Sequence, residues 1–266
     1  MVHVNIQDVR VPQLGLGTWR LTGSTCERAV AEALDIGYRH IDTAQMYGNE
    51  AQVGGGIAAS AVDPRDLFVT TKLSSRSLTP EAVRSSTEES LRRLRLDAID
   101  LLLIHHPARP DVVEDTLGAM QEVRNHGLVR HLGVSNFPVD LLERALRSAE
   151  LFAIQVEYHP FRSQEEQLDA ARRHDLLFQA YSPLARGGVP GHDAIEDVAR
   201  EIGATAAQVA LRWLIDQPNV VPIPKASSRE HLEENWGALD VKLDDDARTR
   251  LDSLSHRERP AAEIGD

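Results

Sequence analysis

Eight short apolar segments, separated by longer stretches with helical patterning, predict an α/β fold in which eight parallel strands close into a (β/α)8 barrel of the TIM type. The length of 266 residues suits one such barrel with short loops, so we expect a single domain over residues 1–266. No low-complexity linker divides the chain. A doubly wound open sheet would show the same alternation, but the strand number and the length favour the barrel.

The predicted strands are rich in Val, Ile and Leu, as is typical of parallel strands buried on both faces. They cover residues 14–17, 40–44, 67–73, 98–105, 129–135, 152–157, 177–181 and 220–224. Ahead of them, residues 2–11 alternate apolar and polar positions, which predicts a β-hairpin before the barrel.

Helical periodicity occupies the intervals between these strands. The predicted helices cover residues 25–36, 80–94, 111–125, 139–149, 164–174 and 206–216. Gly37 and Gly127 stand just past the ends of two of them, where glycine commonly ends a helix. We expect a further helix to open at Ser228. An extra C-terminal helix is expected over residues 244–254, whose acidic start suits a helix N-terminus.

Composition and charge exclude several function classes. The formal net charge is −12, which argues against a nucleic-acid partner because phosphate binding needs a clustered basic face. No apolar run approaches the roughly 18 residues of a membrane span. The N-terminus lacks the pattern of a secretory leader, so we expect a cytoplasmic protein. Cys26 is the only cysteine, which excludes an intramolecular disulfide and disfavours a thiolate-based zinc site.

Polar side chains stand at or near the ends of seven predicted strands, where a barrel of this kind assembles its active site. They are, in chain order, Asp42, Lys72, His105, Ser135, Asn136, Gln155, Tyr181 and Lys225. Each alone has an ordinary structural explanation, such as a helix cap or a satisfied buried histidine. Their recurrence on seven strands indicates a functional site instead. Because the chain has only three lysines, Lys72 and Lys225 stand out further.

Motifs in a fixed order carry a resemblance to a known family. GYRHIDTA at residues 37–44 is followed by YGNE at 47–50, LLLIHHP at 101–107, GVSNF at 133–137, QVEYHP at 155–160, YSPL at 181–184 and IPK at 223–225. On these motifs, which span almost the whole chain, it resembles the aldo-keto reductases, and among them the bacterial branch of 2,5-diketo-D-gluconate reductases. The resemblance implies NADPH-dependent reduction of aldehyde or ketone carbonyls, such as small aldehydes, dicarbonyls and keto sugar acids, with NADH as the alternative cofactor.

The resemblance implies that the reaction is carried by Asp42, Tyr47, Lys72 and His105, with Tyr47 as proton donor. The pKa of a free tyrosine is about 10, and an ammonium about 4 Å away would lower it by roughly the 2 to 3 units that proton transfer near neutrality requires. Asp42 would hold Lys72 charged and aimed. His105 is expected to hydrogen-bond the substrate carbonyl. The competing assignment makes His105 the acid, because the ordinary pKa of histidine is nearer neutrality.

By the same resemblance, two groups of residues bind the cofactor. One would hold the nicotinamide through hydroxyl and amide groups and a stacked ring, and consists of Ser135, Asn136, Gln155, Tyr181, Ser182 and Leu184. The other would hold the phosphate end, and consists of Lys225, Ser227, Arg229, His231, Glu234 and Asn235. The chain departs from the family pattern at Ala226 and His231, where Ser and Arg are common. The expected preference for NADPH over NADH therefore rests on Lys225, Ser227 and Arg229.

The residues expected to line the substrate pocket are Trp19, Met46, His106 and Phe137. His106 stands where many relatives have Trp, and the loops near it and near the C-terminus are short. An open and permissive pocket with a polar rim is therefore expected. The partner is a small carbonyl compound, and we expect a monomer that binds neither nucleic acid nor membrane.

Two other function classes remain on the sequence alone. A metal-dependent barrel hydrolase would account for the eleven histidines, but the first strand lacks an H-x-H pair and neighbours such as His105 and His106 rarely bind one ion together. No metal is therefore expected. A non-catalytic, NADP(H)-binding, redox-sensing subunit would keep the same residues, and the lack of a partner-binding extension disfavours it.

Overall fold

Eight parallel strands form one sheet in the computed structural model, which describes residues 2–255. They are β3 (Leu16–Gly17), β4 (His40–Asp42), β5 (Phe68–Leu73), β6 (Ile99–Ile104), β7 (Val129–Ser135), β8 (Ala153–Glu157), β9 (Leu177–Tyr181) and β10 (Val220–Pro222). Each strand pairs with the next one along the chain. The sheet closes because the amides of Gly15 and Gly17 donate to the carbonyls of Pro222 and Pro224, both at 3.0 Å. The predicted barrel is confirmed.

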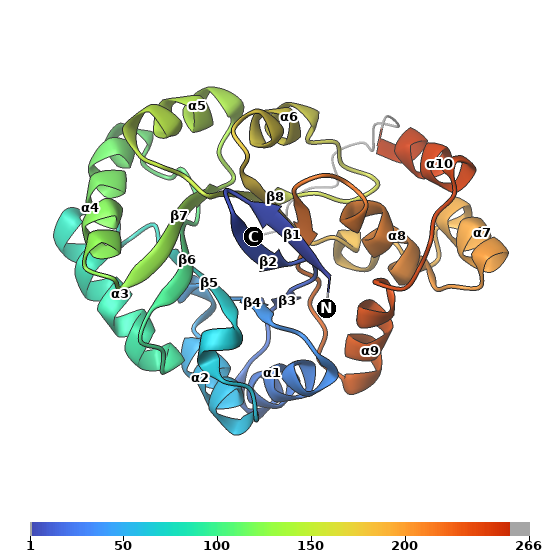
Figure 1. Ribbon diagram of the computed structural model, residues 1–266, viewed down its shortest axis with the longest axis horizontal. Coiled ribbons are helices and arrows are strands. Elements are labelled where there is room, and N and C mark those ends of the chain that lie inside the picture. Colours follow the sequence, from blue (N-terminus) through green and yellow to red (C-terminus); the bar gives the residue numbers. More distant parts are fainter. Residues whose placement is uncertain (1, 256–266) are drawn as a thin grey trace.

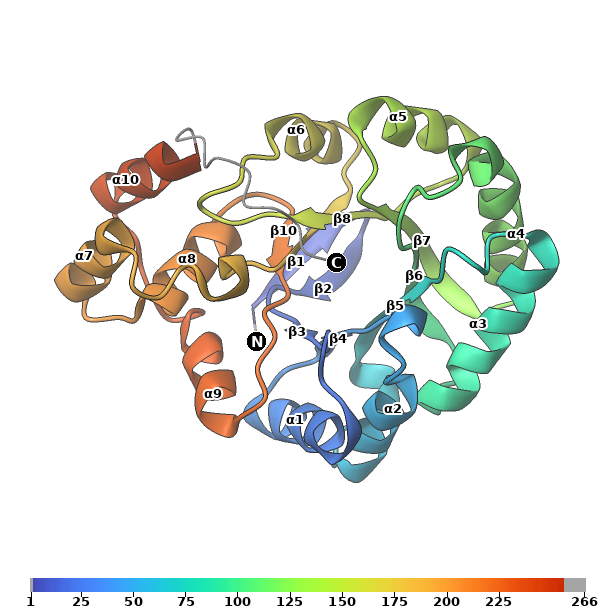
Figure 2. The same ribbon diagram turned by 180° about the vertical axis from the view of Figure 1, so that it is seen from behind.

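The predicted hairpin lies across the N-terminal end of the barrel (Figure 1). Its strands β1 (His3–Ile6) and β2 (Val9–Pro12) are antiparallel and are joined through Gln7 and Asp8, whose φ angles of 45° and 65° are typical of a tight hairpin turn. Ile6 is fully buried against the first residues of several barrel strands. The hairpin therefore seals this end, and Figure 2 looks onto the opposite end, to which the carboxyl ends of the strands point.

Helices surround the barrel in a ring (Figure 1). They are α1 (Gly23–Ile36), α2 (Glu50–Ala59), α3 (Pro80–Leu94), α4 (Val113–Asn125), α5 (Val139–Ser148), α6 (Glu165–Arg173), α7 (Asp193–Ile202), α8 (Ala206–Ile215), α9 (Arg229–Gly237) and α10 (Asp245–Ser255). The six helices predicted between strands are present with their ends within two residues, and α9 and α10 are where they were expected. Within residues 2–255 no helix is both long and apolar enough to cross a membrane.

Two helices, α2 and α7, are not predicted by the sequence patterns. The three consecutive glycines of α2 disfavour a helix in water. In the folded chain they allow close packing: a Cβ on Gly54 would lie 2.3 Å from the backbone oxygen of Arg93 in α3, and one on Gly56 would lie 2.5 Å from that of Glu27 in α1. For α7 the reason is the barrel pattern, which places one helix between consecutive strands. Here both α7 and α8 lie between β9 and β10.

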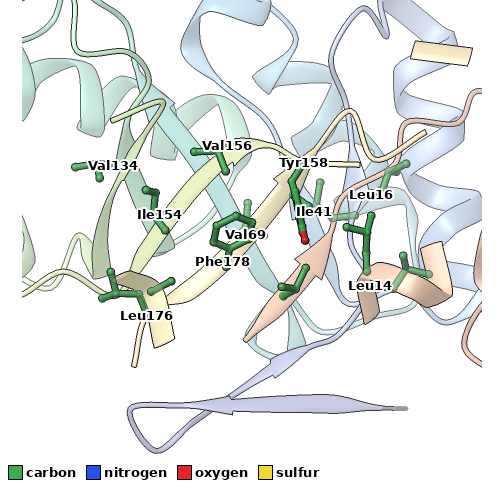
Figure 3. Packing of buried hydrophobic residues seen from close by; sticks show 14 of the residues in the cluster. Leu14, Leu16, Ile41, Val69, Val134, Ile154, Val156, Tyr158, Leu176 and Phe178 are labelled. Carbon is green, nitrogen blue, oxygen red and sulfur yellow. The ribbon is translucent and has the colours of Figure 1, made fainter. Parts of the chain in front are cut away.

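The two faces of the strands differ in chemistry. Residues such as Ile41, Val69 and Phe178 belong to the main apolar core (Figure 3). This core also includes many side chains of the helices. Inside the barrel, apolar residues such as Leu101 and Leu103 fill the end covered by the hairpin. Toward the other end the interior is polar and contains His40, Asp42, Thr70, Lys72, Gln155 and Gln179, all fully or almost fully buried. Buried polar groups need hydrogen-bond partners, and hydrogen bonds among these residues supply many of them.

The only cysteine of the chain lies in the helical layer. Cys26 of α1 is fully buried in the main core. Burial, with a smaller contribution from the charge of Glu27, raises the pKa of its thiol to about 11. A thiol in this state is chemically inert near neutral pH.

Candidate active site

Three side chains form a hydrogen-bonded group at the open end of the barrel. Asp42 ends β4, Lys72 lies late in β5, and Tyr47 ends the short 3-10 helix η1 (Gln45–Tyr47). The Lys72 ammonium nitrogen lies 2.6 Å from Asp42 Oδ1, 2.8 Å from the Thr43 carbonyl oxygen and 3.4 Å from the Tyr47 hydroxyl. An ammonium has three hydrogens, so each has an acceptor. The structure thus brings these three predicted residues together.

Burial controls the electrostatics of this group. Lys72 is 0% exposed and Asp42 is 2% exposed. Burial is the largest single influence and acts to lower the pKa of Lys72, but the charges of Asp42 and Tyr47 and the hydrogen bonds to both together outweigh it. The net shift is upward and the lysine stays charged. Burial also raises the pKa of Tyr47, and Lys72 opposes this only in part. The expected lowering of the tyrosine pKa is therefore wrong for this structure, because desolvation of the phenolate exceeds the attraction of the lysine.

His105 stands beside Tyr47, directly after β6. The two rings meet edge to face with centroids 5.6 Å apart, and His106 stacks on His105 at 4.5 Å. Burial, followed by the charge of Lys72 and the proximity of His106, lowers the pKa of His105 to about 2. The ring is therefore neutral at physiological pH. A neutral imidazole donates one N–H, which suits hydrogen bonding to a carbonyl oxygen better than the role of an imidazolium acid.

A second polar group comes from the ends of β7 and β9. The Asn136 amide nitrogen lies 3.0 Å from Ser135 Oγ and 3.1 Å from the His105 carbonyl oxygen, while the Tyr181 hydroxyl donates to the Asn136 amide oxygen at 2.8 Å. Asn136 has a φ of 62°, a left-handed conformation that asparagine tolerates better than most residues. These contacts hold three of the predicted nicotinamide-binding residues in one rigid set.

Gln155 of β8 is bound to the group formed by Asp42, Lys72 and Tyr47 more closely than the sequence predicts. Its amide nitrogen donates to Asp42 Oδ2 at 2.7 Å and to Gln179 Oε1 at 2.9 Å. Both amide hydrogens are thus engaged inside the barrel. Only the amide oxygen of Gln155 is left to interact with a ligand.

These side chains border a cavity of about 640 Å³. The predicted site residues on its wall are Trp19, Asp42, Met46, Tyr47, His105, His106, Ser135, Asn136, Gln155, Tyr181, Ser182, Leu184 and Lys225. Lys72 lies beneath the wall, fully buried. The volume is within the range of cavities that bind small molecules and cofactors.

Most of the predicted phosphate-end residues lie away from this cavity. The residues that do not border it are Ser227, Arg229, His231, Glu234 and Asn235. Arg229 begins α9 and donates to Asp35 of α1 and to Glu233, both at 2.8 Å. Two carboxylates therefore already neutralise the guanidinium that was expected to meet a phosphate. Among these predicted residues, Lys225 alone is on the cavity wall.

One predicted pocket residue is placed elsewhere. Phe137 is 1% exposed, belongs to the main apolar core and does not border the cavity. The left-handed backbone at Asn136 turns the chain at the end of β7, and Phe137 then leads toward α5. Its ring consequently packs in the layer between strands and helices, so the pocket prediction is wrong at this position.

Two arginines on the cavity wall are absent from the sequence prediction. The guanidinium carbons of Arg20 and Arg186 lie 4.4 Å and 5.5 Å from the centroid of the Trp19 ring, within cation–π range. Their φ angles are 62° and 54°. Left-handed conformations are uncommon outside glycine, and no local sequence pattern marks these two loop positions. Sequence reasoning has no signal for them.

Comparisons with known proteins agree with this geometry. Residues 13–256 match the model of the Aldo/keto reductase family. The Methylglyoxal reductase DkgB of Escherichia coli O157:H7 is 37% identical over 254 residues, which cover 94% of this chain and 95% of the relative. An aldo-keto reductase of Mycobacterium avium (strain 104) is 40% identical over 250 residues, covering 93% of this chain and 87% of the relative.

Solved structures resemble the chain over nearly its whole length. The crystal structure of a putative 2,5-diketo-D-gluconic acid reductase B has a TM-score of 0.94 at 39% identity, covering 100% of this chain and 96% of the other. The thermostable aldo-keto reductase Tm1743, solved with the inhibitor epalrestat, has a TM-score of 0.90 at 36% identity, covering 96% and 100%. From the family match, these identities and the barrel-end site together, the chain belongs to the aldo/keto reductase family of oxidoreductases.

Proposed function

We propose that the protein reduces aldehyde and ketone carbonyls to alcohols, with NADPH as the hydride source and Tyr47 as the proton donor. The observation that carries the proposal is the fully buried Lys72 ammonium, which bonds to both the Asp42 carboxylate and the Tyr47 hydroxyl. A buried cation beside a phenol stabilises the phenolate that remains when the proton leaves. This arrangement favours proton donation to an oxygen that is gaining negative charge.

The protonation states support this division of roles. The raised pKa of Tyr47 keeps its hydroxyl protonated at neutral pH. As negative charge develops on the substrate oxygen, Tyr47 transfers its proton and Lys72 stabilises the phenolate that remains. The attraction between these two charges contributes roughly 4 kcal/mol at about 4 Å and an effective dielectric near 20. The neutral ring of His105 donates its N–H to the same oxygen and orients it. Asp42 keeps the lysine charged and fixed in place.

The cavity wall fits a nicotinamide cofactor, which supplies a hydride when bound. A carboxamide both donates and accepts, and the Gln155 amide oxygen offers an acceptor beside the hydroxyl of Ser135 and the amide of Asn136. The Tyr181 ring, fixed through its hydroxyl, offers a flat surface for stacking. Lys225 on the same wall provides a positive charge for a phosphate.

We propose NADPH over NADH because Lys225 borders the cavity. A charge-assisted hydrogen bond to a phosphate contributes roughly 1.5–3 kcal/mol, so Lys225→Ala should lower the catalytic efficiency with NADPH at least about tenfold. Efficiency with NADH should change much less, since NADH lacks the 2′-phosphate. Steady-state kinetics with both cofactors measure this difference. Equal efficiency of the unmodified protein with the two cofactors would refute the preference.

The substrate class follows from the cavity and from the relatives. Exposed Trp19 and Met46 give the wall an apolar part, and His106 gives it a polar part. Relatives are named for the reduction of methylglyoxal and of 2,5-diketo-D-gluconic acid. We therefore propose small aldehydes, dicarbonyls and keto sugar acids as substrates. NADPH oxidation against aromatic aldehydes, methylglyoxal, α-keto esters and diketo sugar acids tests this class.

Tyr47→Phe tests the proton donor. General acid catalysis contributes about 10²–10⁴ in rate, so turnover should fall at least about a hundredfold while NADPH still binds. Tyr158→Phe is the matched control, because it removes a tyrosine hydroxyl that bonds to Gln217 and does not border the cavity. Near-normal turnover by Tyr47→Phe would show that another group donates the proton.

The same panel tests the redox-sensing alternative. Stoichiometric NADPH binding without turnover of any carbonyl compound would favour a non-catalytic subunit.

We also propose a monomeric, cytoplasmic protein whose net charge of −12 opposes binding to nucleic acid. Light scattering at working concentration measures the oligomeric state. No metal is assigned a role, and residues 2–255 contain no group of three or more His, Cys, Asp or Glu arranged to hold one.

A further inference from the structure

A chain of buried hydrogen bonds runs from Asp42 into the middle of the barrel. The Gln155 amide nitrogen lies 2.7 Å from Asp42 Oδ2 and 2.9 Å from Gln179 Oε1. The Gln179 amide nitrogen lies in turn 2.9 Å from His40 Nε2 and 3.2 Å from Thr70 Oγ1. Each of these five residues is at most 2% exposed. The chain of hydrogen bonds therefore ties together four strands, β4, β5, β8 and β9, across the interior of the barrel.

The direction of every bond in this chain follows from Asp42. A carboxylate only accepts hydrogen bonds, so the Gln155 atom beside it is the amide nitrogen. The Gln179 atom facing that nitrogen must then be the amide oxygen, which leaves the Gln179 nitrogen to donate. His40 Nε2 consequently accepts, and the proton of this imidazole is on Nδ1. Burial, with a smaller effect of Lys72, lowers the pKa of His40 to about 4, which agrees with a neutral ring.

We propose that Gln179 is a positioning residue for the reaction: it fixes the amide of Gln155 so that one hydrogen meets Asp42 and the oxygen is presented to the cavity. In the described part of the chain, Asp42 and Gln179 are the two side chains that bond to the Gln155 amide. Without the Gln179 acceptor, one buried N–H of Gln155 loses its partner. A half-turn of the amide would relieve that loss only by setting its oxygen against the Asp42 carboxylate.

The inference rests on the proposed function at one point, the use of the Gln155 oxygen. An amide oxygen held toward the cavity accepts from the carboxamide of a nicotinamide, whereas a freely rotating amide presents its oxygen only part of the time. Gln179 does not itself border the cavity. Its effect on cofactor affinity must therefore pass through Gln155.

Gln179→Met tests the role, because methionine has a similar volume and neither donates nor accepts strongly. The dissociation constant for NADPH, measured by fluorescence titration, should rise roughly tenfold, the typical effect of leaving a buried polar group without its partner. Thr70→Val is the matched control. It removes the bond from the Gln179 nitrogen to Thr70 and leaves the Gln179 oxygen available to Gln155. Its NADPH affinity should equal that of the unmodified protein.

A double-mutant cycle separates positioning from a merely structural effect. Gln179→Met should weaken NADPH binding in the unmodified background and have no further effect in a Gln155→Ala background. Thermal unfolding of all four proteins verifies that each is folded at the temperature of the titration. An equal fold-change in both backgrounds, or unmodified affinity of Gln179→Met, would overturn the proposal.

A measurement without cofactor keeps this inference distinct from the proposed function. In nitrogen-15-labelled protein, the side-chain amide hydrogens of Gln155 should exchange slowly with solvent in the unmodified chain and in Thr70→Val, and faster in Gln179→Met. Unchanged exchange in Gln179→Met would overturn the inference even if carbonyl reduction is observed. Failure of the unmodified protein to bind NADPH would overturn the proposed function, while the exchange result still decides the orientation of Gln155.

Discussion

At the scale of single residues, the buried pair of Lys72 and Asp42 couples stability to activity. Lys72→Met would leave the Asp42 carboxylate buried without a counter-charge, which typically costs about 3–5 kcal/mol in the free energy of unfolding. The double variant Asp42→Asn with Lys72→Met removes both charges and should regain most of that stability but none of the turnover. Urea unfolding and NADPH oxidation measure the two effects. Restored turnover in the double variant would contradict the assigned role of the lysine.

His40 makes stability depend on pH. Its pKa is lowered to about 4, mainly by burial, whereas in the unfolded chain it is about 6.5. Between these values the unfolded state binds more protons, so the stability contributed by neutral His40 is present above pH 6.5 and is lost as the pH falls. From pH 7.5 to pH 5 the loss is about 2 kcal/mol.

Urea unfolding of the unmodified protein and of His40→Gln at those two pH values measures this contribution. The variant has no titrating ring at position 40, and other groups such as His105 titrate alike in both proteins. The acid-induced loss should therefore be smaller in His40→Gln by the same amount. Equal losses would mean that His40 is not buried in its neutral form.

The site residues that can be predicted from the sequence have similar positions in the fold. Asp42, Lys72 and His105 stand at strand ends, where the barrel gathers its site, and lysine is rare in this chain. Gln179 lies in the middle of β9, so a search for polar residues at strand ends does not identify it. Its importance depends on contacts between strands that are distant in sequence. Phe137 shows the converse error, since membership of the motif at residues 133–137 did not determine where its side chain packs.

At the scale of elements, α2 shows where local propensity and tertiary packing disagree. Gly56→Ala would place a Cβ 2.5 Å from the Glu27 backbone oxygen and 2.7 Å from Val30 Cβ, both in α1. The helices must then separate, and overpacking of this kind costs about 1–3 kcal/mol. Gly118→Ala in α4 is the matched control. No atom would lie within 4 Å of its new Cβ, and a stabilisation of about 0.5–1 kcal/mol is expected from helix propensity.

Thermal unfolding of the two alanine variants measures this contrast. A stabilised Gly56→Ala would mean that α1 and α2 do not pack as closely as described, whereas a destabilised Gly118→Ala would show that the new methyl group in α4 is not free of contacts. Most other elements could be predicted because strand and helix patterns alternate regularly along the chain. Glycine-rich α2 could not, because its helical state depends on neighbours in α1 and α3.

At the scale of the whole molecule, the closed barrel ties the first and last strands together. The amide of Gly15 donates to the carbonyl of Pro222 in β10, and the amide of Gly17 donates to that of Pro224, just after this strand. A Cβ on Gly17 would lie 2.6 Å from the Ile223 backbone oxygen. Length and strand number predict such a ring. The closing contacts join residues far apart in the sequence, so local patterns do not reveal them.

We propose on this basis that the chain unfolds as one domain. Tryptophan fluorescence, which reports on Trp213 in α8 and Trp236 in α9 among others, and far-ultraviolet circular dichroism should give coincident transitions in urea. A break at any strand of a closed ring exposes the interior of all of them, which is the physical reason for cooperativity. Two separated transitions would indicate independently unfolding parts.

The buried thiol of Cys26 gives the molecule a practical property. A thiol with a pKa of about 11 that is fully enclosed does not react with maleimide reagents at neutral pH. A cysteine introduced on an exposed loop would thus be the single point at which a fluorescent dye or a spin label attaches. Loop motion around the cavity can be followed spectroscopically with one label per molecule and without first removing the native cysteine.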